Sequence, residues 1–418
     1  MAINDLSITQ LASKKTELER AYSSLQAENL VLDLTRGKPS SEQLNLSNKL
    51  DGILEEFFEL KDGTDVRNYG GIRGIPEARG IGAVFFDVDP ESVMVGGNSS
   101  LTMMYHYLAH MMPLWRGETE IIKFICVTPG YDRHFTICEE LNIEMISVGF
   151  DKDGPDMETI FSMVENDSSI KGIWCVPKYS NPTGHTYSKK TVKRFSELGK
   201  VAGPNFRIIW DNAYAVHHLG ETPDTLENIK EACEKEGTPD SIIMFASTSK
   251  VTFAGSGISF VSSSKKNLYD FEQYLSAQTI GFDKVNQLRH ARFLKNEEEI
   301  TAHMEKHRAI IQPKFAIVEE KLNDSLAGRD IASWTKPNGG YFISLDTTFQ
   351  VADQVIKLAE KIGVKLTPAG ATFPYGHDPN NSNIRIAPTY PPLNELEKAM
   401  DVLVLCIELA TVTYLLNR

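Results

Sequence analysis

Between about residues 60 and 300, apolar strand-like runs alternate with helical stretches along the chain. The clearest of these runs are residues 92–95, 121–127, 173–176, 206–210 and 242–245. Strands separated by helices favour a largely parallel sheet with helices on both faces. Ligands of such sheets bind beyond the carboxyl ends of the strands. The alternation therefore predicts an α/β fold and indicates where its functional site lies.

The pattern changes towards the C-terminus. Residues 285–325 read as one long, polar helical tract, and the strand-like runs that follow it are widely spaced among helices. Because 418 residues exceed what one hydrophobic core usually covers, we expect a second, smaller α+β domain. The predicted division is an N-terminal helix and part of the small domain (1–55), a large domain (56–310) and the rest of the small domain (311–418).

Composition narrows the class of protein. The formal net charge of −13 argues against nucleic acid as a partner. The five cysteines are odd in number and unclustered, so buried free thiols are expected, with neither disulfides nor a metal site. No signal peptide is evident at the N-terminus, and we expect no run of the roughly 18 apolar residues that a membrane span needs. A cytoplasmic protein without a membrane partner is the resulting prediction.

Lys250 is the most informative residue at the predicted strand ends. It closes a Ser-Thr-Ser-Lys sequence that begins at Ser247, shortly after the strand at 242–245. A lysine in this position is well placed to be partly desolvated and to become a nucleophile. The hydroxyl groups of Ser247 and Ser249 beside it can donate to a phosphate. Taken alone, such a lysine is more often a surface charge, so the neighbouring strand ends decide between the two interpretations.

The two preceding strands end in residues suited to an aromatic, phosphorylated aldehyde. Asp211 can hold a pyridine nitrogen protonated through a charge-assisted hydrogen bond, although a helix N-cap is its plainer interpretation. Tyr214 and Asn181 can both hydrogen-bond the phenolic oxygen of the same ring. Together with Lys250, their order predicts an enzyme that uses pyridoxal 5'-phosphate (PLP), because this cofactor carries its own electron sink and needs few protein groups.

Two loops supply the remaining contacts that PLP needs. Ser99 and Ser100 end a glycine-rich loop that follows the strand at 92–95 and opens a helix. Backbone N–H groups and hydroxyls at a helix N-terminus form an anion site. Tyr131 is the candidate for a flat partner of the ring, but at a turn it can equally be a core tyrosine. Each signal is modest alone, and their combination in this order favours a single cofactor site.

As a set, these motifs resemble the class I (fold type I) PLP-dependent aminotransferases, and within them a divergent bacterial branch of aspartate aminotransferases. The likeness extends from about residue 30 to the C-terminus and rests on residues 37–39, 69–71, 98–100, 131–134, 181–184, 211–214, 247–250, 337–340 and Arg385. It implies a large domain with a mostly parallel, mixed sheet sandwiched by helices, a smaller α+β domain, and a homodimer with shared active sites.

The resemblance also implies a reaction. The enzyme would move an amino group from an L-amino acid, with L-aspartate as the expected donor, to 2-oxoglutarate by a ping-pong mechanism through pyridoxamine phosphate. Two alternatives stay open, because the same active-site groups serve them. One is an aminotransferase specific for alanine or aromatic amino acids, and the other is a PLP-dependent β-lyase.

Within the family likeness, each matched residue has an implied role. Lys250 forms the imine with PLP and, once the substrate releases it, moves the substrate proton. Asp211 pairs with the ring nitrogen, and His134 stands behind it as a supporting partner. The other ring contacts implied are those of Asn181 and Tyr214 with the phenolic oxygen and of Tyr131 on the ring face. The phosphate-binding residues implied are Ser99, Ser100, Ser247, Ser249 and, from the neighbouring subunit, Tyr69.

Substrate binding is assigned in the same way. Arg385 would hold the α-carboxylate through a two-pronged guanidinium contact, with the Gly37 backbone N–H and Asn181 beside it. One departure from the family concerns the phosphate: residues 251–259 contain no basic residue, where most relatives carry an arginine. Either Ser256 and backbone donors replace that charge, or a cation comes from elsewhere. The candidates for a cation that binds a second, distal carboxylate are Arg36, Lys38, Arg73 and Arg133.

Overall fold

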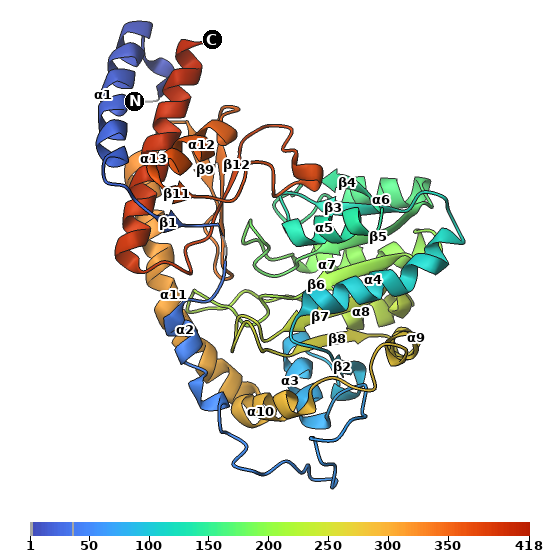
Figure 1. The fold of residues 1–418 in the computed structure, drawn as a ribbon. Coiled ribbons are helices and arrows are strands. Elements are labelled where there is room, and N and C mark those ends of the chain that lie inside the picture. Colours follow the sequence, from blue (N-terminus) through green and yellow to red (C-terminus); the bar gives the residue numbers. More distant parts are fainter. Residues whose placement is uncertain (1–2, 36) are drawn as a thin grey trace.

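The structure is a computed structural model that describes residues 3–35 and 37–418. Its larger part is built on a seven-stranded sheet with the order β2-β8-β7-β6-β5-β3-β4 (Figure 1). All neighbouring strands except the pairs made by β8 are parallel, so the predicted mostly parallel, mixed sheet is confirmed. The strands are β2 (Val93–Val95), β3 (Lys123–Val127), β4 (Glu144–Val148), β5 (Ile170–Cys175), β6 (Arg207–Asp211), β7 (Ile242–Ser247) and β8 (Ser259–Ser263).

Helices cover both faces of this sheet, which explains why its central strands are apolar at nearly every position. Ile208 of β6 packs into the core on one face, while the next residue, Ile209, packs into the core on the other. The first face is covered by α3 (Pro76–Phe86), α6 (Met157–Asn166), α7 (Lys189–Glu197) and α8 (Ile229–Glu236). The second is covered by α4 (Ser100–Arg116), α5 (Asp132–Glu140) and α9 (Lys265–Ser276).

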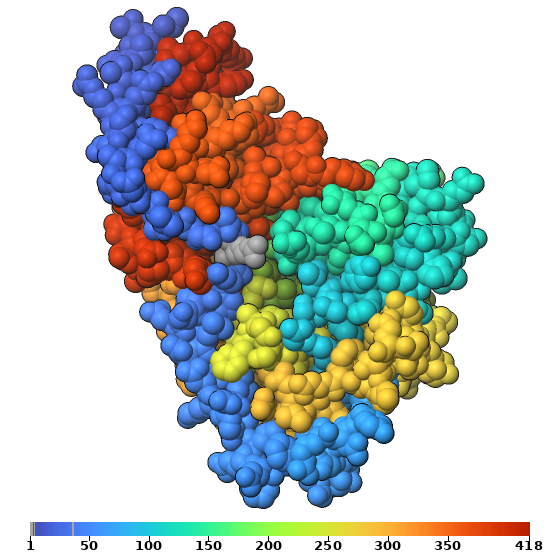
Figure 2. All heavy atoms as spheres, viewed as in Figure 1, coloured from blue at the N-terminus to red at the C-terminus, as the bar shows by residue number. Residues whose placement is uncertain are grey.

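The smaller part contains two short sheets. One is antiparallel, with the order β12-β10-β9, and the other is a parallel pair of β1 and β11. Its elements are β1 (Leu32–Asp33), β9 (Ala332–Trp334), β10 (Ile343–Thr347), β11 (Val364–Lys365), β12 (Asn383–Ile386), α1 (Ile8–Gln26), α12 (Ala352–Ile362) and α13 (Leu393–Leu416). Because β1 pairs with β11, the N-terminal segment packs with the C-terminal one (Figures 1 and 2). The exact division at residues 55 and 310 stays a prediction.

The predicted helical tract at 285–325 is two helices and not one. The first, α10 (Lys284–Leu294), ends where Lys295 adopts a left-handed backbone with φ of 43°. Asn296 then caps α11 (Glu297–Leu326), because its side-chain oxygen accepts a hydrogen bond from the Glu299 N–H at 3.0 Å. Neither glycine nor proline stands at this break, so the sequence reads as one continuous helix.

The expectation that no segment is long and apolar enough for a membrane span is wrong for α13. By length and composition alone this helix qualifies, with a mean hydropathy of 1.9 over its most apolar window. Inside the protein, however, 67% of that window is buried, and α13 packs against α1, α11 and α12. Its apolar character is therefore accounted for by its position in the core of the smaller part. The five cysteines are free and buried, as predicted.

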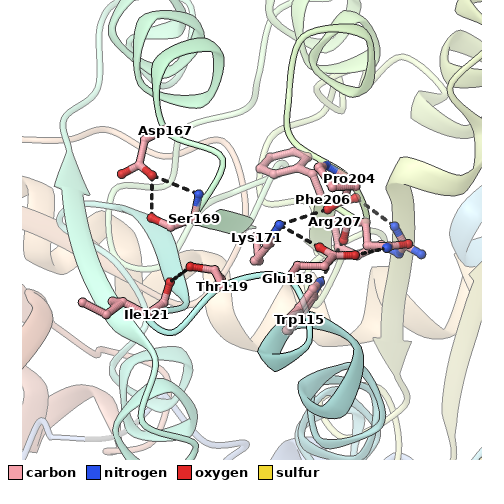
Figure 3. Close-up of polar contacts among 11 residues, drawn as sticks. Trp115, Glu118, Thr119, Ile121, Asp167, Ser169, Lys171, Pro204, Phe206 and Arg207 are labelled. Atoms are coloured by element: carbon pink, nitrogen blue, oxygen red, sulfur yellow. Dashed lines mark hydrogen bonds and ion pairs between the residues drawn. The ribbon is translucent and has the colours of Figure 1, made fainter.

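Two lysines at the amino ends of the central strands are paired with carboxylates. Lys171 of β5 is almost fully buried, and its Nζ lies 2.8 Å from Oε2 of Glu118 and 3.3 Å from the Pro204 carbonyl oxygen (Figure 3). Lys123, at the start of β3, pairs with Asp167 at 2.9 Å. Both of these lysines therefore have a carboxylate partner within the protein.

Candidate active site

A cavity of about 650 Å³ lies at the carboxyl ends of β5, β6 and β7, where the two parts of the protein meet. Its volume is in the range of small-molecule and cofactor sites. Both parts contribute to its walls, because Lys250 follows β7 and Arg385 belongs to β12. The predicted site residues that line it are Gly37, Ser99, Ser100, Tyr131, Asn181, Asp211, Tyr214, Lys250 and Arg385. Residues from seven separate segments of the sequence therefore converge on one cavity.

Lys250 reaches into this cavity from the end of β7. Its Nζ lies 5.1 Å from the centroid of the Tyr214 ring. Burial lowers the pKa of the Lys250 amine, while the negative charge of Asp211 opposes this shift. The main chain is held from the other side, since the Lys250 carbonyl oxygen lies 3.3 Å from His217 Nε2 and accepts a hydrogen bond from the Tyr341 hydroxyl at 3.4 Å. The result is an anchored backbone with an amine that deprotonates more readily than a surface lysine does.

Asp211 has one oxygen paired and one oxygen unpaired. Its side chain is almost completely buried, and Oδ2 lies 3.0 Å from His134 Nε2. The His134 ring is stacked on Trp174 at 4.1 Å between centroids with an interplanar angle of 6°, so its orientation is fixed by packing. Oδ1 is buried and has no hydrogen-bond partner among the residues that the structure describes. A buried carboxylate oxygen without a donor is costly, so this atom fits the protonated ring nitrogen of PLP.

Two tyrosines and an asparagine form the walls beside Asp211. Burial raises the pKa of both the Tyr131 and the Tyr214 phenols well above the usual range, so both hydroxyls stay protonated and can donate. Tyr131 precedes α5, and Tyr214 follows β6 by three residues. Asn181 is buried, and its Oδ1 accepts a hydrogen bond from Arg385 Nη1 at 3.3 Å. These groups are arranged to flank a flat ring and to donate to an oxygen on it.

The N-terminus of α4 forms an anion-binding end of the cavity. Ser99 is the N-cap residue of α4, and Ser100 is its first residue. The unpaired N–H groups and the positive end of the helix dipole there favour a phosphate. Ser247 and Ser249 are not part of the cavity lining, so their predicted contact with a phosphate stays a prediction. Their hydroxyl oxygens lie 3.0 Å apart, and Ser249 donates to the carbonyl oxygen of Asn98 at 3.4 Å. Through this bond the loop before α4 and the loop that carries Lys250 are joined.

Arg385 is fixed on the opposite wall by partners from both parts of the protein. Its side chain is 7% exposed, and Nε donates to Thr367 Oγ1 at 3.3 Å. Nη1 pairs with Asp132 Oδ1 at 2.9 Å. The guanidinium carbon also lies 4.9 Å from the centroid of the Phe342 ring. Asp132 was missed as a site residue, although it lies within the matched segment 131–134, directly after the tyrosine predicted to stack on the ring.

Gly37 lies against the same aromatic ring. A Cβ atom at this position would lie 2.4 Å from Cζ of Phe342, so any larger residue would push the ring away. Glycine therefore allows the main chain to approach the wall on which Arg385 is held. The sequence suggested Gly37 for its N–H group alone, and the role of Phe342 was missed because nothing in the local pattern singles it out.

Tyr69 and the four candidates for a distal cation differ in whether they line the cavity. Tyr69 is 80% exposed and is not part of the cavity lining, so its role across a subunit interface stays a prediction. Among the four candidates for a distal cation, Lys38 and Arg133 line the cavity. Arg73 does not, and its Nε lies 3.7 Å from Oε2 of a glutamate on α9. Arg36 lies outside the described residues.

Comparisons with known proteins agree with this geometry. The family described as "Aspartate amino-transferase" matches residues 6–418. A Corynebacterium glutamicum protein named aspartate aminotransferase is 42% identical over 426 residues, which cover 100% of this chain and 98% of that protein. The crystal structure of an aspartate transaminase from the same species has a TM-score of 0.95 and 41% identity over 99% of both chains. An α-aminoadipate aminotransferase from Thermus thermophilus, complexed with N-(5'-phosphopyridoxyl)-L-leucine, shares the fold at 19% identity and a TM-score of 0.74, covering 92% of this chain and 93% of its own.

Proposed function

This chain belongs to the aspartate amino-transferase family, and from that premise we propose that it transfers the amino group of L-aspartate to 2-oxoglutarate with PLP as its cofactor. Aminotransferase activity follows from family membership over the whole chain. The choice of L-aspartate as donor and the assignment of individual residues are the proposal. The observation that carries it is the buried, unpaired Oδ1 of Asp211, which lies in the same cavity as the Lys250 amine.

Bound PLP would supply an electron sink for the electrons released at the substrate Cα. Asp211 Oδ1 would accept a hydrogen bond from the protonated ring nitrogen, and His134 would hold the other carboxylate oxygen. Ser99 and Ser100 at the start of α4 would bind the phosphate. The ring would be flanked by Tyr131 and would receive donors from Tyr214 and Asn181 at its phenolic oxygen. All of these residues except His134, which contacts Asp211 Oδ2, line the cavity, and this supports the proposed roles.

Lys250 would be the group that moves the proton. Burial lowers the pKa of its amine, so the neutral form that a base at Cα requires is reached more easily than in an exposed lysine. The hydrogen bonds from the Tyr341 hydroxyl and the His217 ring to its carbonyl oxygen keep its main chain in place while the side chain changes partner. A base held in this way needs little reorganisation between the two halves of a transamination cycle.

Recognition of a dicarboxylate would use two cations of the cavity. Arg385 would bind the α-carboxylate through its guanidinium group. Lys38 and Arg133 are the two remaining candidates that line the cavity, and either would meet a carboxylate at the far end of the substrate. A homodimer would place Tyr69 in the neighbouring site, and its high exposure in the single chain supports that proposal.

The proposal is tested with purified protein supplied with PLP. Production of oxaloacetate from L-aspartate and 2-oxoglutarate, followed with an NADH-coupled assay, is the expected result. L-Alanine and aromatic amino acids as donors test the other transaminase specificities. Pyruvate and ammonia formed without any oxo acid from an amino acid that carries a leaving group at Cβ, such as L-cysteine, would indicate a β-lyase and contradict the proposal.

A matched pair of lysine variants assigns the catalytic base. Lys250→Ala should lower transamination by several orders of magnitude, because it removes the amine that lies in the cavity 5.1 Å from the Tyr214 ring and shares that cavity with Asp211. Lys266→Ala is the control, since Lys266 is exposed on α9 and pairs there with Asp270 at 3.0 Å. Equal activity of the two variants would show that Lys250 is not the base.

A further inference from the structure

Asp132 supplies the counter-ion of Arg385 from within the protein. It is the first residue of α5 and lines the cavity beside Tyr131. Its Oδ1 lies 2.9 Å from Arg385 Nη1, and its Oδ2 lies 3.7 Å from Arg133 Nε. One carboxylate of the protein thus pairs with two of the arginines that line the cavity. Arg385 is the residue proposed to bind the substrate α-carboxylate, and Arg133 is a candidate for the distal one.

The two partners of this ion pair differ in how firmly they are held. Arg385 is only 7% exposed and is fixed by Thr367 and by the ring of Phe342. The Asp132 side chain is 30% exposed and lies in the first turn of α5, where the helix dipole stabilises a negative charge without any partner. If the pair opens, Asp132 is therefore the partner that moves, since it can turn to solvent or to Arg133.

We propose that Asp132 is a built-in competitor of the substrate: it holds Arg385 until a substrate carboxylate takes its place on the guanidinium group. Asp132 is then a positioning residue that sets the affinity of the site for carboxylates. The inference rests on the proposed role of Arg385 as the substrate-carboxylate residue.

Displacement changes the energetics of binding. A substrate carboxylate that meets Arg385 exchanges one guanidinium–carboxylate pair for another, so only the difference between the two pairs contributes to affinity. The buried guanidinium is never left without a counter-ion, which avoids the cost of an unpaired buried charge. The same exchange assists the release of product, because Asp132 competes for Arg385 in both directions. The expected consequence is weaker ground-state binding together with faster turnover.

The test measures binding of succinate, a dicarboxylate without an amino group, to the PLP-loaded protein by calorimetry. Asp132→Asn keeps the shape of the side chain and removes its charge, and Asp132→Ala removes the competing oxygen altogether. We expect both variants to bind succinate about tenfold more tightly, because succinate no longer has to displace the half-buried, charge-assisted hydrogen bond between Asp132 and Arg385. KM for L-aspartate should fall in parallel, while kcat stays equal or decreases.

The matched control is Glu158→Gln. Glu158 is likewise in the first turn of a helix, α6, and is likewise paired with an arginine, Arg194 at 3.0 Å, but it does not line the cavity. This variant should bind succinate as the unmodified protein does. A gain of the same size in Glu158→Gln would mean that net charge, and not exchange at Arg385, controls the affinity, and would overturn the inference.

Other outcomes separate this inference from the proposed function. Unchanged or weaker succinate binding in both Asp132 variants, with an unmodified protein that transaminates, overturns the inference alone. In that case Asp132 orients Arg385 and does not compete for it. An unmodified protein that neither binds succinate nor transaminates L-aspartate refutes the proposed function itself. Circular dichroism and thermal unfolding of each variant verify that the fold is retained.

Discussion

Replacing His134 by phenylalanine isolates the contribution of one hydrogen bond to cofactor binding. The phenylalanine ring can keep the stacking on Trp174, where the imidazole now lies at 4.1 Å with an angle of 6° between the planes. What it removes is the contact of 3.0 Å between His134 Nε2 and Asp211 Oδ2. Because Oδ1 also has no partner among the described residues, the buried carboxylate would have no donor at either oxygen.

The size of the effect follows from the burial of that carboxylate. A hydrogen bond to a charged group contributes about 1.5–3 kcal/mol, and Asp211 is only 2% exposed, so solvent cannot replace the lost donor. Without His134 the ionised form of Asp211 is less stable relative to the protonated form, and a protonated Asp211 cannot pair with a protonated ring nitrogen. At about 1.4 kcal/mol for each factor of ten, PLP should therefore bind about 10- to 150-fold more weakly to His134→Phe. The turnover number should fall as well, because the ionised carboxylate that faces the ring nitrogen is less stable.

The assay is an equilibrium titration of the cofactor-free protein with PLP, followed by absorbance of the bound cofactor. His134→Gln is the matched variant, since the glutamine amide can return an N–H donor near the position of Nε2. It should regain most of the affinity that His134→Phe loses. If His134→Phe binds PLP as tightly as the unmodified protein, or if the glutamine variant is equally impaired, the hydrogen bond does not have the role assigned to it.

Three further predictions concern other parts of the structure. Gly37→Ala places a Cβ atom 2.4 Å from Cζ of Phe342, so we expect a loss of about 1–3 kcal/mol in unfolding free energy and a higher KM for L-aspartate, and an unchanged KM would contradict the packing argument. Arg385→Lys replaces a planar donor pair by a point charge, and steady-state kinetics should show KM raised about tenfold or more with a smaller change in kcat. Burial lowers the pKa of both His290 and His307 to about 4, so the unfolded chain binds more protons than the folded protein between about pH 6.5 and 4. The free energy of unfolding should therefore decrease as the pH is lowered from about 6.5 to 4, by up to about 1.4 kcal/mol per pH unit for each histidine. Equal urea midpoints at pH 7 and pH 5 would refute this.

Much of the cofactor-facing wall was predictable from the sequence because of a property of parallel sheets. Strands that run in one direction bring their carboxyl ends to one edge, so polar residues that follow successive strands become neighbours. Asn181 follows β5, Asp211 is the last residue of β6, and Lys250 follows β7. These strands are adjacent in the sheet, and all three residues line one cavity. Their order along the chain was therefore enough to predict their proximity.

The substrate-facing wall was less predictable, because it depends on contacts between the two parts of the protein. Arg385 and Asp132 are 253 positions apart, and no local periodicity relates β12 to the first turn of α5. The same holds for Gly37 and the ring of Phe342, which approach each other only because β1 pairs with β11 and so carries the N-terminal segment into the smaller part. Matching motifs located Arg385 but gave no information about its partner.

The apolar alternation and the polar residues at strand ends were enough to predict the sheet and the edge at which Lys250 and Asp211 share a cavity, because those features depend on segments that are each encoded locally. Tertiary structure alone decided how the two parts meet, which carboxylate occupies the buried arginine, and that the apolar α13 is a core helix. The physical reason is that pairings between distant segments are selected by the total burial and charge compensation of the folded protein. A residue's immediate neighbours in the chain carry little information about that total.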